Sequence, residues 1–247
     1  MKTSIWIGVL LMGVISSTSA ALFNYTGPAY AIPDGNINGA FSAISVSGSG
    51  LSLTDIKVTL DVSGGFNGDL YAYLSYGGNL VPLLNRVGVG TINGGTAFGS
   101  TGSGFTVTLA STGTDIHWTS GTLTGNYLAD GRAIDPLSGA VNFNADGARN
   151  LDGTFGGVNP NGTWTLFFAD VSGGGGTATL NGWSLDVTAV PEPAAWGIIS
   201  AAGLLVISGL HNWRSVRKRQ REATTTLKLG HPSNTLSHYS PPHCWRR

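Results

Sequence analysis

Apolar and polar residues alternate along several short segments between residues 41 and 188. In one of them Val58, Leu60 and Val62 are separated by polar residues, and period two recurs in 41–47, 70–74, 105–109, 164–168 and 183–188. This period places alternate residues on one face of a β-strand. Glycine-rich turns separate the strands. The pattern predicts an all-β domain, a single β-sandwich or jelly roll, with Trp164 and Trp183 in its core.

The N-terminal end of the chain has a different pattern. Residues 1–20 contain Lys2, an apolar run from Ile5 to Ile15, and small residues that end in Thr18-Ser19-Ala20. This order is typical of a secretory signal peptide that is cleaved after Ala20. A retained N-terminal anchor is the alternative, and the shortness of the apolar run disfavours it. We therefore expect an exported domain over residues 21–189.

A second apolar run lies near the C-terminal end. Residues 194–210 include no charged residue, and as a helix they would span roughly 25 Å, about the thickness of a bilayer core. The cations that follow are Arg214, Arg217, Lys218, Arg219 and Arg221. Basic residues that flank a membrane span stay on the cytoplasmic side, so we expect the preceding domain on the opposite side of the membrane. Pro191 and Pro193 prevent the helix from extending upstream.

The segment 190–221 resembles the PEP-CTERM sorting signal of Gram-negative bacteria, with Pro191, Glu192 and Pro193 as its motif. The resemblance implies cleavage by an exosortase-like enzyme at the inner membrane and delivery to the outer surface or the extracellular space. The simpler alternative is a permanent single-span anchor. Residues 222–247 continue beyond the usual end of such signals; they are polar and aperiodic, which predicts disorder. They are either a cytoplasmic tail or an artefact of gene calling.

The expected exported domain is acidic. It holds eleven Asp, no Glu and only four basic residues, which gives a net charge of −7, whereas the whole chain has a net charge of zero. Phosphate binding needs concentrated Lys and Arg, so nucleic acid is excluded as a partner. Asp favours turns, which agrees with a loop-rich β-domain. The single cysteine, Cys244, lies outside the domain, so neither disulfides nor thiolate metal sites are expected.

Two blocks of the domain carry a family likeness. The first block is 53–62 with Asn67-Gly68-Asp69-Leu70 and 83–88, and the second is 159–166 with 169–171 and 180–185. Together they resemble the P domain, also called Homo B, of proprotein convertases. Residues 90–139 match poorly and are interpreted as an insertion. The resemblance implies a non-catalytic β-sandwich that supports a subtilisin-like protease. The 169 residues of the domain leave no room for such a protease.

The sequence argues against an enzyme. His117 is the only histidine of the domain, so a Ser-His-Asp triad would depend on it, and its segment 114–118 holds no nucleophile motif. We expect a surface histidine or a structurally hydrogen-bonded one. One His without Cys does not provide a zinc site. A glycosidase needs paired carboxylates, and the domain lacks Glu, the commonest general acid.

Calcium is the one cofactor that the sequence leaves open. Carboxylates and loop carbonyls supply its ligands, and the candidate residues are Asp69, Asp170, Asp130, Asp135, Asp146 and Asp152. The calcium-loop pattern of EF-hands is absent. The alternative is that each Asp caps a turn.

Tyr71 and Tyr73 lie on the polar face of their strand and form a candidate glycan site, although a solvated tyrosine row is the simpler interpretation. The sequence therefore predicts a non-enzymatic surface or matrix protein with a binding or structural role in exopolysaccharide or biofilm. The alternatives are a carbohydrate-binding or adhesive module, and an accessory domain that acts on a secreted subtilisin-like protease.

Overall fold

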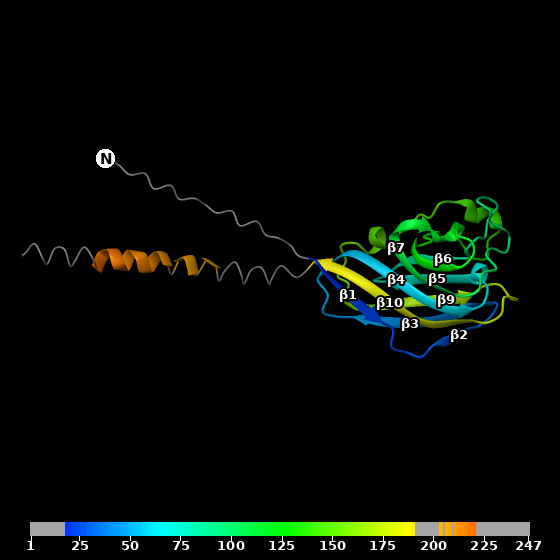
Figure 1. Ribbon diagram of the computed structural model, residues 1–247, viewed down its shortest axis with the longest axis horizontal. Coiled ribbons are helices and arrows are strands. Elements are labelled where there is room, and N and C mark those ends of the chain that lie inside the picture. The colour runs from blue at the N-terminus through cyan, green and yellow to red at the C-terminus, as the bar shows by residue number, and fades with distance from the viewer. Residues whose placement is uncertain (1–17, 191–202, 205, 209, 221–247) are drawn as a thin grey trace, which may run out of the picture. The chain divides into compact units, whose positions relative to one another are not determined.

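Ten β-strands form two sheets in the computed structural model, which describes residues 18–190, 203–204, 206–208 and 210–220 (Figure 1). The strands are β1 (Ser19–Asn24), β2 (Tyr30–Ile32), β3 (Asn36–Val46), β4 (Ser52–Gly64), β5 (Leu70–Tyr76), β6 (Asn79–Asn85), β7 (Phe105–Asp115), β8 (Leu123–Leu128), β9 (Gly162–Asp170) and β10 (Ala178–Val190). Helical structure between the strands is limited to α1 (Leu151–Phe155) and the single 3₁₀ turns η1 (Asn67–Asp69), η2 (Ile116–Trp118) and η3 (Ala140–Asn144). The prediction of an all-β domain is confirmed.

The larger sheet has the order β1-β10-β4-β7-β8, with β2 also paired to β10, and the smaller sheet has the order β3-β9-β5-β6. Neighbouring strands are antiparallel except β7 and β8, which are parallel. The segment 90–139, which matches the P domain poorly, supplies β7 and β8 and so belongs to the larger sheet.

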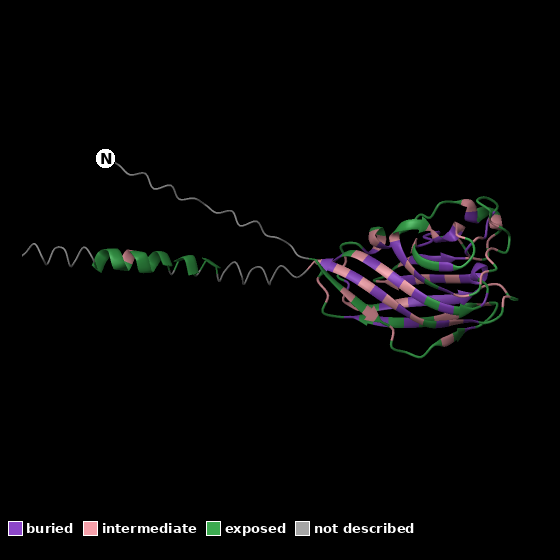
Figure 2. Cartoon of the chain, viewed as in Figure 1, coloured by how far each residue is buried: buried purple, intermediate pink, exposed green. Residues whose placement is uncertain are grey.

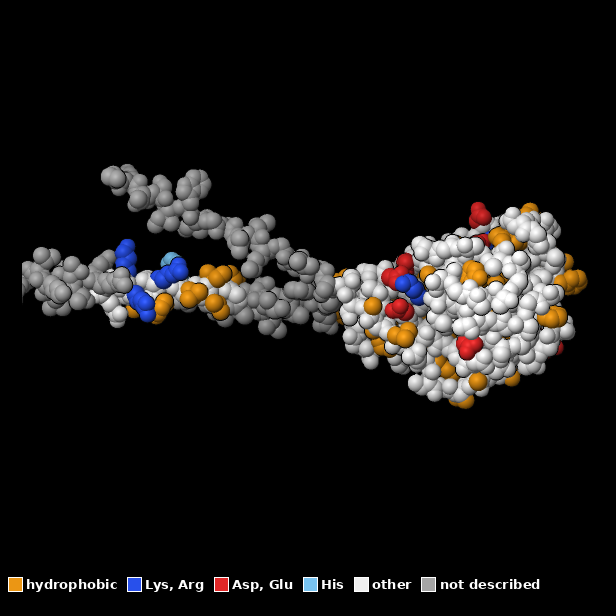
Figure 3. Space-filling model, in the orientation of Figure 1, with side chains coloured by type: hydrophobic (Ala, Val, Ile, Leu, Met, Phe, Trp, Pro, Cys, Tyr) orange, Lys and Arg blue, Asp and Glu red, His pale blue; other side chains and the backbone are white. Residues whose placement is uncertain are grey.

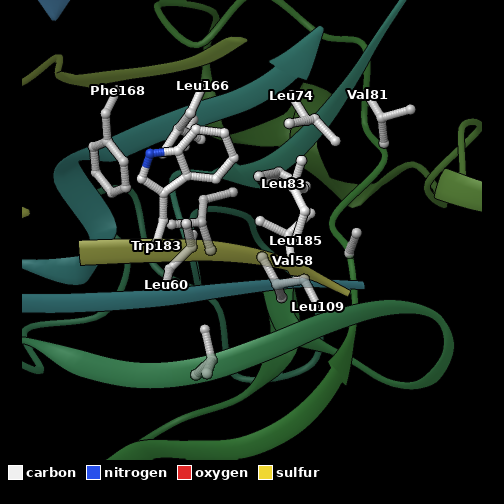
Figure 4. Close-up of a cluster of buried hydrophobic side chains, with 14 of the residues drawn as sticks. Val58, Leu60, Leu74, Val81, Leu83, Leu109, Leu166, Phe168, Trp183 and Leu185 are labelled. Carbon is white, nitrogen blue, oxygen red and sulfur yellow. The ribbon is translucent and has the colours of Figure 1, made fainter. Parts of the chain in front are cut away.

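One hydrophobic core lies between the sheets. Buried and exposed residues alternate along the strands, as the bands of colour in Figure 2 show. Val58, Leu60 and Leu109 of the larger sheet meet Leu74 and Leu166 of the smaller sheet in this core (Figure 4). Trp164 and Trp183 are buried as expected, at 0% and 4% exposure. In the strands that alternation predicted (β3, β4, β5, β7, β9 and β10), it therefore identified the inward face correctly, because one face of each sheet is buried.

Both ends of the domain lie at the same end of the sandwich. Ser19 is paired with Ala189, so β1 begins beside the point where β10 ends (Figure 1). The expected cleavage site after Ala20 falls within β1, and the four residues from Ala21 to Asn24 keep their pairing with β10. We call the opposite end, where β10 begins and β4 ends, the loop end.

The chain divides into two units, Met1–Glu192 and Pro193–Arg247. In the second unit the described residues 203–204, 206–208 and 210–220 are helical. Among the residues that the structure describes, no helix is both long enough and apolar enough to cross a membrane. Much of the expected span 194–210, most of the expected signal peptide and the tail 222–247 lie outside the described residues.

Candidate functional site

Four aromatic side chains lie together on the outer face of the smaller sheet, and we call them the aromatic patch. Phe41 comes from β3, Phe167 from β9, and Tyr71 and Tyr73 from β5. Strand register brings them together, because Phe167 is paired with Phe41 on one side and with Tyr73 on the other. Phe41 is 65% exposed, and both tyrosines are half-buried. Tyr71 and Tyr73 therefore belong to a larger group than the sequence indicated.

The rings of the aromatic patch support one another. Phe167 is stacked on Tyr73 with 4.9 Å between ring centroids, and Phe41 packs against Phe167 at the same centroid distance with a tilt of 54°. Tyr71 contacts both Tyr73 and Phe167 at its edge. Aromatic pairs at such distances are attractive beyond their buried area. The four rings therefore form one packed group rather than a set of independent side chains.

The two phenol groups of the patch remain protonated at neutral pH. Burial raises the pKa of Tyr73 above 10.0. Burial also raises the pKa of Tyr71, and the neighbouring phenol and the carboxylates Asp130 and Asp135 raise it further. A protonated phenol both donates and accepts a hydrogen bond. The patch thus combines apolar ring surface with two hydroxyl groups.

A shallow cavity of about 300 Å³ adjoins the patch on the outer face. Tyr73 forms part of its wall together with Ser75, Asn79, Thr163 and Thr165. The hydroxyl groups of the two threonines make no hydrogen bond to any residue that the structure describes. Apolar ring surface beside free hydroxyl and amide groups matches the alternating apolar and polar surface of a sugar ring. No charged residue lines this cavity.

Asp69 and Asp170 are neighbours at the loop end, where Asp170 is paired with Leu70. Both are buried, at 5% and 0% exposure. One oxygen of Asp170 accepts hydrogen bonds from the backbone of Ser172 and Gly35, while Oδ2 is buried without a partner among the described residues. Burial raises the pKa of Asp170 to about 6, and the charges of Asp69 and Asp34 add to this shift.

This raised pKa predicts that the domain loses stability as the pH rises from about 4 to about 6. The unfolded Asp170 ionises near pH 4, whereas the folded carboxyl group ionises at about pH 6. Above the folded pKa the domain holds an unfavourable buried charge. We expect the free energy of unfolding to fall by roughly 1–3 kcal/mol over this range. Asp170→Asn should remove most of this decrease in the free energy of unfolding. Urea unfolding at pH 4.5 and pH 7 measures the decrease in both proteins. An equal decrease in the variant would contradict its assignment to Asp170.

The expected calcium site at Asp69 and Asp170 stays a prediction. Within the described part of the chain, no group of three or more His, Cys, Asp or Glu side chains is arranged to hold a metal ion. Asp69 also faces a cation of the protein, because Arg86 Nη2 lies 3.9 Å from its Oδ1. If these carboxylates bind calcium, added calcium should stabilise the wild-type domain at pH 7, and Asp170→Asn should reduce this stabilisation.

The structure does not bring Asp130, Asp135, Asp146 and Asp152 together as a group of metal ligands. Asp130 is buried and its oxygens accept hydrogen bonds from His117, Arg132 and the backbone of Asn85. Asp135 caps a turn through the backbone of Leu137, and Asp152 accepts a hydrogen bond from the backbone of Ile56. Asp146 is exposed. The carboxylates of Asp130, Asp135 and Asp152 are therefore occupied by cations or backbone donors, and Asp135 fits the turn-cap alternative.

His117 is a structural histidine. Its Nδ1 lies 2.7 Å from Asp130 Oδ2, and its Nε2 lies 2.8 Å from the carbonyl oxygen of Val89. The ring is fully buried and stacks on Phe143. In a catalytic triad the second ring nitrogen faces a nucleophile, whereas here a main-chain carbonyl occupies that position. Of the two interpretations of His117, the hydrogen-bonded one is confirmed and the surface one is wrong.

The residues of the expected sorting signal are only partly described. Pro191, Glu192, Pro193 and Arg221 lie outside the described residues. Arg214, Arg217, Lys218 and Arg219 lie on the described helical segment 210–220, where the guanidinium group of Arg217 packs 3.6 Å from the ring centre of Trp213.

Sequence reasoning did not identify Phe41, which is 65% exposed, or Phe167, which is buried at 7% exposure, as members of the patch. Alternation along its strand places Phe167 on the outer face of the sheet, as it does for Tyr73, so the sequence was sufficient to predict the side on which Phe167 lies. The convergence of the rings was not predictable in this way, because it depends on β3 and β5 both pairing with β9. Strand order is a long-range property that local alternation does not contain.

Comparisons with known proteins give a limited likeness. No family model matches the chain, and no curated protein matches it. Among solved structures, the Aeromonas sobria serine protease in complex with the chaperone ORF2 is similar at 18% identity with a TM-score of 0.39. The serine protease of Aeromonas sobria is similar at 15% identity, also with a TM-score of 0.39. Each alignment covers 72% of this chain and 28% of the solved chain, so the chain spans less than a third of those proteins.

Proposed function

We propose that this protein is a non-enzymatic, exported surface or extracellular-matrix protein that binds neutral polysaccharide through the aromatic patch. The observation that carries the proposal is the convergence of Phe41, Tyr71 and Tyr73 around the buried ring of Phe167 on the outer face of the smaller sheet. Large aromatic rings on a surface usually mark a contact with a ligand or partner. The adjoining cavity supplies the hydroxyl and amide groups that orient a sugar.

The charge distribution favours a neutral ligand. The cavity beside the patch has no charged wall, while the exported domain as a whole has a net charge of −7. An acidic polysaccharide would be repelled by this net charge at low ionic strength. Charged side chains are also sparse on the face of the domain in Figure 3. We therefore expect neutral glycans to bind more tightly than uronic-acid polymers.

Affinity electrophoresis through gels that contain a neutral polysaccharide tests this proposal. We expect Tyr73→Ala and Phe41→Ala each to weaken retardation, with a dissociation constant roughly tenfold higher for each lost ring. Leu22→Ala is the matched control, because Leu22 is also an exposed apolar side chain, 62% exposed, on the other sheet. Equal weakening by the control, or none by the patch variants, contradicts the proposal.

The export and sorting part of the proposal rests on the tripartite order of 190–221 in the sequence. An exosortase-like enzyme is its processing partner, and β10 ends at Val190, directly before the motif. The intact mass of the protein recovered from its native host tests this part. A species that begins near Ala21 and ends near Pro191–Pro193 supports processing at both ends. A species that retains Arg214–Arg219 supports the permanent anchor instead.

A second candidate is an accessory domain that acts on a secreted subtilisin-like protease. The two sequence blocks that resemble the P domain favour it, and both contribute core strands, namely β4 to β6 and β9 to β10. Co-purification of a protease of this class with the native protein, together with no binding to polysaccharide, would favour this candidate over the first.

A further inference from the structure

A second cavity, of about 470 Å³, lies among the loops before β7 and β8 at the loop end. Trp118 is its one aromatic wall, and glycine, serine, threonine and asparagine residues of 88–104 and 119–122 form the rest. No charged residue lines it. The cavity shares no lining residue with the aromatic patch or with the shallow cavity beside it.

Trp118 is held in place by the buried charged network behind it. It follows His117 in η2, and the guanidinium group of Arg132 lies over the indole at 5.4 Å from the ring centre. Arg132 is in turn held by Asp115 at 2.7 Å. Gly90 and Gly95 let the backbone approach the indole closely, because a Cβ atom at either position would collide with the ring. The wall is therefore fixed before any ligand arrives.

Backbone hydrogen bonds also fix the loops around the cavity. Gly88 donates to the carbonyl oxygen of His117 at 2.6 Å, and Ser100 donates to that of Val87 at 2.8 Å. On the other side Asn67 donates to the carbonyl oxygen of Gly102 at 2.8 Å. A cavity held in this way needs little ordering when a ligand binds, which favours affinity.

Four of the hydroxyl groups that line the cavity are free to bind a ligand, whereas those of Thr96, Ser100 and Thr119 make hydrogen bonds to the protein backbone. Thr101, Ser103, Ser120 and Thr122 line it, and their side chains make no hydrogen bond to any described residue. Each hydroxyl donates one hydrogen bond and accepts two. Several free hydroxyl groups around one indole, without a charge, suit a neutral ligand that is itself rich in hydroxyl groups and has an apolar ring face.

We infer that this cavity binds one neutral sugar residue, either as a free monosaccharide or as the end of a glycan chain. Trp118 packs against the sugar ring, and the threonine and serine hydroxyl groups bind its hydroxyl groups. The inference does not rest on polysaccharide binding by the aromatic patch, because the two sites have separate walls. It assigns a role to the buried network of His117, Asp130 and Arg132, which positions Trp118.

Isothermal titration of the full-length chain with glucose, galactose and mannose tests the inference, with a neutral oligosaccharide as a further probe. We expect at least one monosaccharide to bind, and Thr101→Val/Thr122→Val to weaken it about fivefold to tenfold. Valine keeps the shape of threonine, so the fold is retained. Trp118→Ala should weaken binding more than tenfold. Tyr73→Ala in the aromatic patch is the control and should leave this affinity unchanged.

The outcomes separate the two sites and the two sources of the sugar. Binding of the oligosaccharide but of no monosaccharide, lost in the threonine double variant, assigns the cavity to a chain end. If no neutral sugar binds at about 10 mM, the inference is overturned, because a dissociation constant above this concentration does not indicate a specific site. Equal affinity of wild type and double variant also overturns it. If sugar binding is lost in Tyr73→Ala but kept in the cavity variants, the sugar binds to the aromatic patch instead.

Discussion

Replacement of Arg132 by methionine is expected to lower the free energy of unfolding by about 3–5 kcal/mol, because it leaves two carboxylates without their cation. Arg132 is 1% exposed. Its guanidinium group lies 2.7 Å from Asp115 and 3.3 Å from Asp130. Burial alone lowers the pKa of Arg132, but hydrogen bonds and charges from both carboxylates outweigh this effect and raise the pKa above its usual range. The guanidinium group therefore stays charged at every pH at which the domain is folded.

Lys57→Met is the matched control for this prediction. Lys57 and Asp55 also form an ion pair, at 3.3 Å, but their side chains are 42% and 36% exposed. Exposed pairs contribute less than about 1 kcal/mol. Urea unfolding followed by circular dichroism compares the two variants. If Arg132→Met lowers the free energy of unfolding no more than Lys57→Met does, the ion pairs of Arg132 with Asp115 and Asp130 do not stabilise the fold.

Replacement of Trp164 by alanine is expected to have the second large effect, lowering the free energy of unfolding by about 3–5 kcal/mol. Trp164 is fully buried on β9, and its indole N–H donates to the carbonyl oxygen of Pro160 at 2.9 Å. The ring stacks on Tyr76 with 4.2 Å between centroids and meets Phe155 edge-on at 5.0 Å. Alanine removes these contacts and leaves a cavity that the surrounding strands cannot fill.

Phe41→Ala provides the contrast, because the two changes should affect different properties. Phe41 is 65% exposed, so its removal should cost less than about 1 kcal/mol of stability. It should nevertheless weaken polysaccharide binding, whereas Trp164→Ala at a temperature where it stays folded should not. Thermal unfolding measured beside affinity electrophoresis separates the two effects. A large stability loss for Phe41→Ala would make the aromatic patch a structural feature.

The strands β3, β4, β5, β7, β9 and β10 were predictable because apolar and polar residues alternate along them, whereas β1, β2, β6 and β8 were not predicted, and burial along β6 does not alternate. The alternation of Leu70, Ala72 and Leu74 with Tyr71 and Tyr73 appears in the structure as alternating burial. The pairing of the strands was less accessible, since β9 is paired with β3 and β5, which lie far from it along the chain. Such pairings depend on contacts between distant segments rather than on local pattern.

The sequence could predict a candidate site only where residues of one type on a single strand identify it. The sequence placed Tyr71 and Tyr73 on a polar face, and the structure adds Phe41 and Phe167 beside them. It grouped Asp130 with Asp135, Asp146 and Asp152, because spacing along the chain does not reveal that Asp130 is buried against His117 and Arg132. Buried ion pairs form between residues whose proximity the fold creates, so composition alone could not assign them.

The most direct test of the proposed function is the binding of the wild-type protein to a neutral polysaccharide from the matrix of its host. The proposal predicts retardation in affinity electrophoresis that Phe41→Ala and Tyr73→Ala weaken and that Leu22→Ala leaves intact. Migration of the wild-type protein that is unaffected by every neutral polysaccharide tested would contradict the account.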